Sequence, residues 1–272
     1  MPDYGRIDHE YGLRLATIPP EDDGPVWMVN LMRYKEQAEY GDGRETTLSG
    51  RQADDAYTPL GPLAAVGAEI VFVAEVEDQY VGAEPTWDRV AIVKYPTRRS
   101  FVEMQQRNDF KEAHEHKEAG MAETIVIGGL PLDGVPASPA RPDWDSVPHP
   151  PTEADGPYTM LHVIRFHERD GATVTPDLMA DYQQVAGSVA VPHGVRIDGW
   201  FTAEGTIVGD GRVWHQVRVN TFPSKQAFMA VAMDPARLEA QRHRRETAIA
   251  DTYTMGLRPS VNRLAESVST QN

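Results

Sequence analysis

Residues Gly24–Glu36 read GPVWMVNLMRYKE, and the chain repeats the pattern as GPYTMLHVIRFHE in Gly156–Glu168. A second pair of segments follows in the same order, WDRVAIVKYP in Trp87–Pro96 and WHQVRVNTFP in Trp214–Pro223. The two offsets are nearly equal (156 − 24 = 132 and 214 − 87 = 127). We therefore predict an internal duplication, with two ordinary domains in the 272 residues.

Each predicted domain has the order strand, helix, strand, strand, helix, strand. In the first, the predicted strands are Val26–Tyr34, Glu69–Val76, Trp87–Tyr95 and Thr124–Gly128, and the helices run from Ser49 toward Val66 and over Arg98–Ala119. In the second, the strands are Tyr158–Phe166, Arg196–Ala203, Trp214–Phe222 and Thr252–Gly256, with helices over Thr175–Val189 and Ser224–Ala250. Prolines at 59 and 62 must kink or shorten the first helix.

This βαββαβ order is typical of a ferredoxin-like unit, whose two helices cover one face of its sheet. A second copy in the same chain can bury the other face. The predicted fold class is therefore α+β, with two fused ferredoxin-like units forming an intramolecular dimeric α/β barrel of antiparallel sheets. The predicted divisions are an N-terminal arm (1–23), a first unit (24–132), a Pro-rich linker (133–155), a second unit (156–262) and a flexible tail (263–272).

Composition narrows the class of protein. A net charge of −15 disfavours a nucleic-acid partner, because a basic excess is needed to displace counterions. The chain has no cysteine, which excludes disulfides and thiolate sites. No apolar run approaches the ~18 residues of a membrane helix, and no signal pattern precedes residue 24. We expect a soluble cytoplasmic protein that binds a small-molecule substrate and can form a further homodimer.

The first half resembles a known family. The segments that carry the resemblance are Val26–Leu31, the turn Gly43–Gly50, Trp87–Pro96 and Phe110–Gly120. They are similar to the family called domain of unknown function 1330, of the dimeric α/β-barrel superfamily. The second half resembles that family only through the internal repeat. The resemblance implies the fold and no particular activity; relatives in the superfamily include cofactor-free monooxygenases, cyclases, isomerases and haem-binding chlorite dismutase-like proteins.

Positions at which the halves differ indicate where a function could lie. Strand alternation places Gln216, Arg218 and Asn220 on one face of the third strand, where the first half has Arg89, Ala91 and Val93. The third strand is central in the sheet order 4-1-3-2 that this topology implies. Each unpaired buried polar group costs ~1–3 kcal/mol. These side chains therefore either form an internal ion-pair network or line a polar cavity.

Two histidines also distinguish the second half. His162 replaces Asn30, and His215 replaces Asp88. Imidazole is the natural acid or base for moving one proton at neutral pH. With His162 as acid/base, Arg218 and Asn220 would stabilise an enolate-like oxyanion. Whether these three side chains share a face depends on the strand register, which the sequence leaves open.

The resemblance implies a rival site in the first half, where His114 and Tyr57 would face a cleft between helices and sheet, the place in which relatives of this fold often hold their ligands. His114 and His116 point to different faces of a helix, so they cannot ligate one metal together, and we expect no metal site. The doubled Arg33 and Arg165 either pair with nearby carboxylates or bind an anion at a pocket mouth. Asn30, Gln216 and His215 complete the predicted substrate-binding residues.

Three functions are compatible with this pattern. The first is a cofactor-independent enzyme that performs proton-transfer chemistry, as an isomerase, cyclase or monooxygenase, on a carbonyl or phenolic compound. The second is a non-catalytic protein that binds a small acid or aromatic compound. The third is haem binding of the chlorite dismutase-like kind, for which no histidine stands out as the axial ligand.

Overall fold

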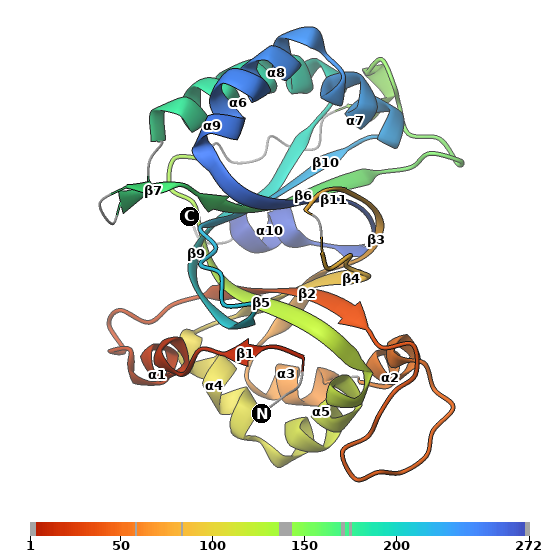
Figure 1. Ribbon diagram of the computed structural model, residues 1–272, viewed down its shortest axis with the longest axis vertical. Helices are drawn as coiled ribbons and strands as arrows, with labels where there is room; N and C mark the ends of the chain where they lie inside the picture. The colour runs from red at the N-terminus through yellow and green to blue at the C-terminus, as the bar shows by residue number, and fades with distance from the viewer. Residues whose placement is uncertain are drawn as a thin grey trace. The chain divides into compact units, whose positions relative to one another are not determined.

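The computed structural model describes residues 4–57, 59–82, 84–135, 143–169, 172–173 and 176–269. The chain divides into two compact units (Figure 1). Unit 1 comprises Met1–Glu75, Glu84–Leu130 and Ala203–Val213, and unit 2 comprises Val76–Ala83, Pro131–Thr202 and Trp214–Asn272. Each unit therefore takes a short strand segment from the opposite half of the sequence.

The first half of the chain follows the predicted order of elements. Its strands are β1 (Arg6–Ile7), β2 (Val26–Tyr34), β3 (Glu69–Val81), β4 (Arg89–Tyr95) and β5 (Met121–Pro131). Its helices are α1 (His9–Thr17), α2 (Gly50–Ala56), α3 (Leu60–Ala65), α4 (Arg98–Gln106) and α5 (Asn108–Gly120). The predicted break of the first helix at its prolines is confirmed, because α2 ends at Ala56 and α3 begins at Leu60.

The second half repeats this order. Its strands are β6 (Tyr158–Phe166), β7 (Glu168–Arg169), β8 (Ala172–Thr173), β9 (Arg196–Gly209), β10 (Gln216–Phe222) and β11 (Ile249–Asn262). Its helices are α6 (Pro176–Ala190), α7 (Lys225–Ala232), α8 (Pro235–Ala240), α9 (Glu246–Ala248) and α10 (Leu264–Ser269). Single helical turns lie at η1 (Trp144–Ser146) and η2 (Val191–His193), and a π-helical segment at η3 (Gln241–Arg245).

Strand pairing confirms the predicted fold class. The order is β1-β9-β10-β6-β11-β3-β4-β2-β5, and β9 also pairs with β5, so eight strands form a closed antiparallel barrel topology. In each half the third strand, β4 or β10, lies between the first and the second. The predicted 4-1-3-2 order is therefore correct, and it makes β10 a central strand.

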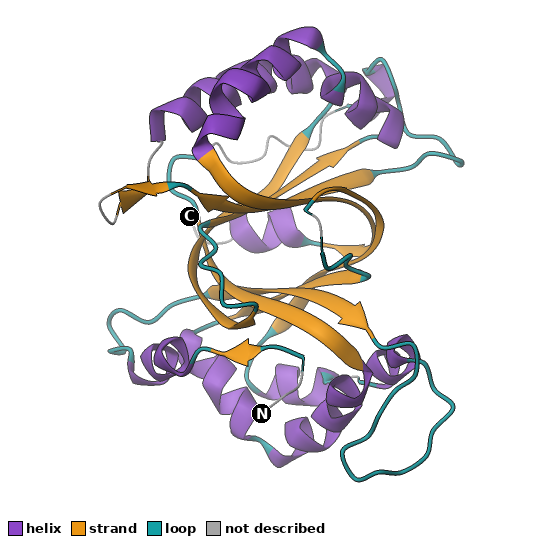
Figure 2. Cartoon of the chain, in the orientation of Figure 1, coloured by secondary structure: helices purple, strands orange, loops and turns teal. Residues whose placement is uncertain are grey.

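Helices cover one face of the sheet in each unit (Figure 2). In unit 1, Met28 of β2 packs in one core cluster with Leu63, Met104 and Phe110 of the helices. In unit 2, Met160 packs with helical residues and Phe222 in a matching cluster. This apolar packing leaves a hollow between helices and sheet in each unit, described below.

Two predicted long helices are shorter than expected. The helix predicted over 98–119 breaks at Arg107, whose extended backbone (φ −67°, ψ 140°) ends α4 before α5 starts. The helix predicted over 224–250 breaks at Asp234, whose carboxylate caps α8 while Pro235 occupies its first turn. Proline at the first helical position favours a new start over continuation of the preceding helix.

Two predicted second strands are longer than expected. β3 continues to Val81 rather than ending at Val76, and β9 continues to Gly209 rather than to Ala203. The additional residues of each strand belong to the other compact unit. In unit 1, Glu204 accepts hydrogen bonds from Arg98 Nε at 2.7 Å and Tyr11 Oη at 3.1 Å. The residue pattern within one half of the sequence could not indicate that the end of its strand belongs to the unit of the other half.

The first residue of α2, at position 50, must be glycine. The Gly50 backbone N–H donates to Lys35 O at 3.0 Å, and Lys35 N–H donates to Gly120 O at 2.9 Å. A Cβ at Gly50 would lie 2.4 Å from Gly120 O and 2.5 Å from Lys35 O. The backbone at Gly50 therefore lies directly against the backbone of Lys35 and of Gly120. Only a residue without a side chain permits this close approach.

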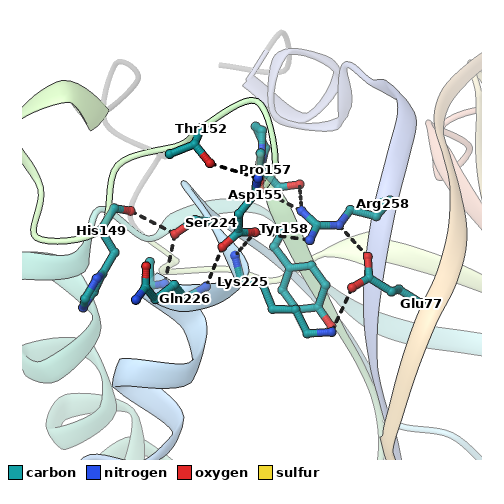
Figure 3. Close-up of polar contacts among 12 residues, drawn as sticks. Glu77, His149, Thr152, Asp155, Pro157, Tyr158, Ser224, Lys225, Gln226 and Arg258 are labelled. Atoms are coloured by element: carbon teal, nitrogen blue, oxygen red, sulfur yellow. Dashed lines mark hydrogen bonds and ion pairs between the residues drawn. The ribbon is translucent and has the colours of Figure 1, made fainter.

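A polar cluster fixes the linker segment that precedes β6 in unit 2 (Figure 3). The Asp155 carboxylate accepts the backbone N–H groups of Lys225 at 2.9 Å and Gln226 at 3.0 Å, in the first turn of α7. Arg258 donates to Glu77 Oε2 at 2.6 Å, to Asp155 Oδ1 at 3.2 Å and to Gly156 O at 2.8 Å. Every charge in this cluster has a partner, so its role is structural.

Candidate functional site

A row of polar and aromatic side chains crosses the sheet of unit 2. The Cα partners in this row are Trp200 with Arg218, Arg218 with His162, and His162 with Thr254. Directly opposed residues in antiparallel strands present their side chains on the same face. The structure thus brings His162 and Arg218 together, and thereby fixes the register that the sequence left open.

This row forms part of the wall of a cavity of about 560 Å³ in unit 2. His162, Arg218 and Asn220, the three residues predicted as a catalytic group, all line it. Two further arginines, Arg237 and Arg245, line the same cavity. The lining also includes apolar side chains such as Met160, Ile164, Phe228 and Val231, and one carboxylate, the exposed Asp133.

Arg218 is held by neutral partners. Its Nε donates to Gln216 Oε1 at 3.0 Å, and its guanidinium lies 4.5 Å from the Trp200 ring centre. Gln183, in the orientation that turns its oxygen toward Arg218, accepts two further bonds at 2.6 and 2.9 Å. Among the described residues Arg218 makes no ion pair. Burial, together with the charge of Arg245, lowers the pKa of Arg218 to about 10, so it is still a cation at neutral pH.

His162 is a neutral imidazole at neutral pH. Burial, followed by the positive charges of Arg245, Arg218 and Arg237, holds its pKa well below the usual value. Its Nδ1 lies 3.1 Å from Thr254 Oγ1. In the tautomer in which Nδ1–H donates to that hydroxyl, Nε2 carries the lone pair and can accept a proton.

The remaining polar groups of the cavity are oriented by hydrogen bonds. Asn220 Oδ1 accepts from Trp200 Nε1 at 2.8 Å. Arg237 donates to Tyr182 Oη at 3.1 Å and to the carbonyl oxygens of Val231 and Ala232, near the end of α7. Arg237 thus contributes charge to the cavity while stabilising the helix end.

A second cavity of about 680 Å³ lies in unit 1. It contains the rival pair, His114 and Tyr57, whose rings are 5.9 Å apart in an edge-on arrangement. His114 Nε2 lies 3.2 Å from Tyr4 Oη. Burial, and then the charge of Lys117, lowers the pKa of His114 to about 4. Burial raises the pKa of Tyr57 above its usual range.

The two cavities hold different residues at equivalent strand positions. Asn30 pairs with Ala91 in unit 1, where His162 pairs with Arg218 in unit 2. In unit 1 the positive charge comes from a helix instead, because Lys117 Nζ of α5 lies 3.4 Å from Asn30 Oδ1. Asn30 lines the unit 1 cavity, as predicted for a substrate-binding residue.

Other predicted binding residues lie outside both cavities. Arg33 pairs with Glu123 at 2.6 Å, and Arg165 is exposed. His215 Nδ1 accepts the backbone N–H of Phe166 at 2.9 Å, and its Nε2 lies 3.1 Å from Glu168. Gln216 acts through its hydrogen bond to Arg218.

Sequence reasoning missed Trp200, Arg237 and Arg245 in unit 2 and Lys117 in unit 1. The three cavity residues on helices sit in polar stretches that resemble solvent-facing helix surface. A signal was present for Lys117, which is three residues from His114 and therefore on the same helix face.

Groups of metal-ligating side chains and membrane-spanning helices are both absent from the part of the chain that the structure describes. There, no three His, Asp or Glu side chains are grouped to hold a metal ion. In the same residues, no helix combines the length and apolar character needed to cross a membrane.

Comparison with solved structures is consistent with the topology. An anthrone oxidase-like protein superposes with a TM-score of 0.50 at 13% identity, over 89% of this chain and 96% of that one. The chain therefore shares the closed antiparallel α/β-barrel fold of this protein. At this identity the likeness of the dimeric α/β barrels shows the fold alone.

Two further solved structures superpose with TM-scores below 0.5. The methylated RPA0582 protein of Rhodopseudomonas palustris, a protein of unknown function, is 31% identical over 49% of this chain and 98% of its own, with a TM-score of 0.42. A mutant chlorite dismutase from Candidatus Nitrospira defluvii is 11% identical over 92% of this chain and 95% of its own, with a TM-score of 0.48. No protein-family description matches the chain, and no curated protein matches it.

Proposed function

We propose that the cavity of unit 2 binds a small organic anion and that His162 moves one proton on it. The carrying observation is the cross-strand pair of His162 and Arg218 in a cavity that two further arginines line. The substrate class is a carbonyl or phenolic compound that carries, or develops, a negative charge on oxygen. The reaction class is isomerisation, cyclisation or cofactor-free oxidation.

The charges of the cavity support an anionic ligand. Arg218 and Arg237 have neutral partners among the described residues, so their positive charge is not cancelled within the wall. A buried cation that lacks a counter-ion is costly, and a carboxylate or enolate would offset that cost. The apolar part of the wall favours an aromatic or aliphatic body on the same ligand.

The proton-transfer step follows from the placement of His162. In the proposed step, Nε2 takes a proton from the carbon beside a substrate carbonyl, and the electron pair of the broken C–H bond moves onto the carbonyl oxygen. Arg218, directly across from His162, stabilises the resulting enolate oxygen. Return of the proton to a different carbon completes an isomerisation, and the same enolate is the nucleophile for ring closure.

A bound anion also increases the proton affinity of His162. Three guanidinium charges disfavour imidazolium at His162 in the free protein. A bound anion offsets those charges, so the proton affinity of His162 rises when substrate is present. The base is therefore strengthened by the ligand on which it acts.

Haem fits this wall poorly. An axial imidazole would have to place the positively charged iron beside Arg218, Arg237 and Arg245, which already disfavour one added positive charge at His162. The non-catalytic alternative is a protein that holds the same anion without moving a proton.

A test uses phenylpyruvate, an aromatic 2-oxo acid with an exchangeable carbon-bound proton. Proton NMR in D2O follows deuterium incorporation, and calorimetry gives the dissociation constant. We expect His162→Gln to slow exchange by ~100-fold or more with little change in affinity, and Arg218→Gln to weaken binding by ~10-fold or more. His167→Gln, an exposed histidine of the same unit, is the control.

The outcomes separate the two alternatives. Exchange at the buffer rate with intact, Arg218-dependent binding would support the binding-protein alternative. Exchange that survives His162→Gln unchanged would remove His162 from the mechanism. We also propose, on the resemblance of Val26–Leu31 and Trp87–Pro96, that the first half belongs to the domain of unknown function 1330 family.

A further inference from the structure

The unit 1 cavity differs from the arginine-lined cavity in the chemistry of its wall. Apolar side chains such as Met28, Val93, Phe101 and Phe110 make up much of it. Arg89 also lines it, but its guanidinium is engaged by Asp54 at 3.0 Å, Asp55 at 2.8 Å and Glu75 at 2.9 Å. The wall therefore lacks the excess of positive charge that favours an anion in unit 2.

The side-chain amine of Lys117 lies in this apolar cavity and has one long hydrogen bond. Lys117 Nζ reaches Asn30 Oδ1 at 3.4 Å and lies 5.7 Å from the ring centre of Tyr57. It makes no ion pair with any described residue. Burial lowers the pKa of Lys117, and the charge of Asp54 opposes that effect only in part. An ammonium with one long hydrogen bond is less stable than in water, which favours the neutral, nucleophilic amine.

A proton acceptor lies one helical turn away. His114 is three residues before Lys117 on α5 and lines the same cavity. Its Nε2 contacts Tyr4 Oη, while Nδ1 is buried without a hydrogen-bond partner among the described residues. A buried ring nitrogen that lacks a partner costs ~1–3 kcal/mol. A ligand group that donates to Nδ1 would recover that cost.

We propose that the unit 1 cavity is a second small-molecule site, in which the Lys117 amine captures an apolar or aromatic aldehyde or ketone as an imine. The amine nitrogen bonds to the carbonyl carbon, and the C=O electron pair moves to oxygen. The nitrogen gives up its two protons, the oxygen leaves with them as water, and a C=N bond forms. No oxidant or reductant is consumed, and His114 accepts the first proton that the nitrogen releases.

The site discriminates by charge as well as by reactivity. Tyr57 and Tyr4 supply hydroxyl donors beside an apolar body, and Asn30 Oδ1 orients the amine. A neutral carbonyl compound satisfies these groups, whereas a carboxylate would lie near Asp54 and Glu118, which also line the cavity. The ligand class is therefore distinct from the anion proposed for unit 2.

Reductive trapping tests the proposal directly. The folded, full-length protein is incubated near neutral pH with benzaldehyde and sodium cyanoborohydride, which converts an imine into a stable benzylamine. Intact mass and a peptide map then locate the added benzyl group. We expect one dominant adduct at Lys117, formed at least fivefold faster than at Lys35, Lys94, Lys111 or Lys225.

Variants sharpen the test. Lys117→Arg keeps a long side chain and removes the reactive amine, so the dominant adduct should disappear, whereas Lys111→Arg, at an exposed lysine of the same cavity, should retain it. His114→Gln should slow trapping about tenfold. If the benzyl groups are spread evenly over all lysines of the protein without substitutions, the proposal is overturned and no variant is needed to decide it. Phenylpyruvate exchange at His162 should be unchanged in Lys117→Arg, so the two proposals can fail separately.

Discussion

His162 and Arg218 are direct cross-strand partners at the centre of the unit 2 sheet, with Trp200 and Thr254 continuing the same row on either side. The pair places a neutral imidazole beside a guanidinium that has no counter-ion among the described residues. The positive charges of this cavity wall disfavour one another, and a bound anion offsets them. The relationship therefore couples ligand charge to the protonation of His162.

Proton uptake on binding is the first prediction. The free protein holds His162 neutral because its pKa lies well below the usual value, and a bound anion raises that pKa. Binding of phenylpyruvate should therefore take up a small fraction of a proton near pH 7, which leaves most of His162 as the free base, and its affinity should increase as the pH falls below 7. Calorimetry in buffers of different ionisation enthalpy measures this uptake. Loss of the buffer dependence in His162→Gln would assign it to this residue; persistence would contradict the coupling.

The second prediction concerns stability in acid. The folded-state pKa of His114 is about 4, below its ordinary value. Between about pH 6.5 and 4 the unfolded chain binds a proton at this residue that the folded protein does not, so stability falls as the pH falls. The loss should reach roughly 2–3 kcal/mol at pH 4.

Urea unfolding from pH 7.5 to 4 measures this loss. Because carboxylates titrate in the same range, the comparison is the difference between the unmodified protein and His114→Gln. That difference should grow smoothly below pH 6.5 in favour of the variant. Parallel curves for the two proteins would show that His114 is not held neutral by the fold.

The third prediction concerns the backbone crossing at Gly50. Gly50→Ala would place a Cβ 2.4 Å from Gly120 O and 2.5 Å from Lys35 O, and neither backbone oxygen can move independently. We expect a loss of more than about 3 kcal/mol in the free energy of unfolding. Gly61→Ala is the control, since a Cβ there meets no atom within 4 Å and the residue lies in α3. Alanine at position 61 should stabilise by up to about 1 kcal/mol, measured by urea unfolding.

The fourth prediction concerns the polar cluster around Asp155 (Figure 3). Arg258→Ala removes the ion pair to Glu77 and the hydrogen bond to Gly156 O, and leaves the carboxylates of Glu77 and Asp155 with one partner fewer. We expect about 1–2 kcal/mol of destabilisation by thermal or urea unfolding. Arg242→Ala, at an exposed arginine of the same unit whose hydrogen bond to Leu238 O is 3.5 Å long, should change stability by less than about 0.5 kcal/mol. Equal effects of the two substitutions would mean that the cluster does not hold the linker.

The sequence was sufficient for the fold class because apolar runs and their repetition determine strand order. It also predicted His162, Arg218 and Asn220 as candidate site residues, because polar residues on central strands need partners or a cavity, and all three line the unit 2 cavity. Their convergence was not available from the sequence, since a shift of register by one residue would have turned one row to the other face.

The helices and strands whose predicted bounds differ from the structure do so for identifiable reasons. The break at Asp234-Pro235 carried a capping signal that the long helical pattern concealed. The extra length of β3 and β9 carried none, because strand length there is set by pairing partners far away in sequence. Lys117 and Arg245 were missed for a related reason, since a charged residue on a helix indicates solvent exposure unless the cavity beneath it is known.

The exchanged strand ends have a consequence for modularity. Tyr11 and Arg98 belong to the N-terminal half, yet the carboxylate that they share is Glu204, which the C-terminal half encodes. A gene fragment that ends at the linker would encode unit 1 without its segment of β9. Removing either half should therefore destabilise the other, since each unit would lose a strand segment that the other half encodes.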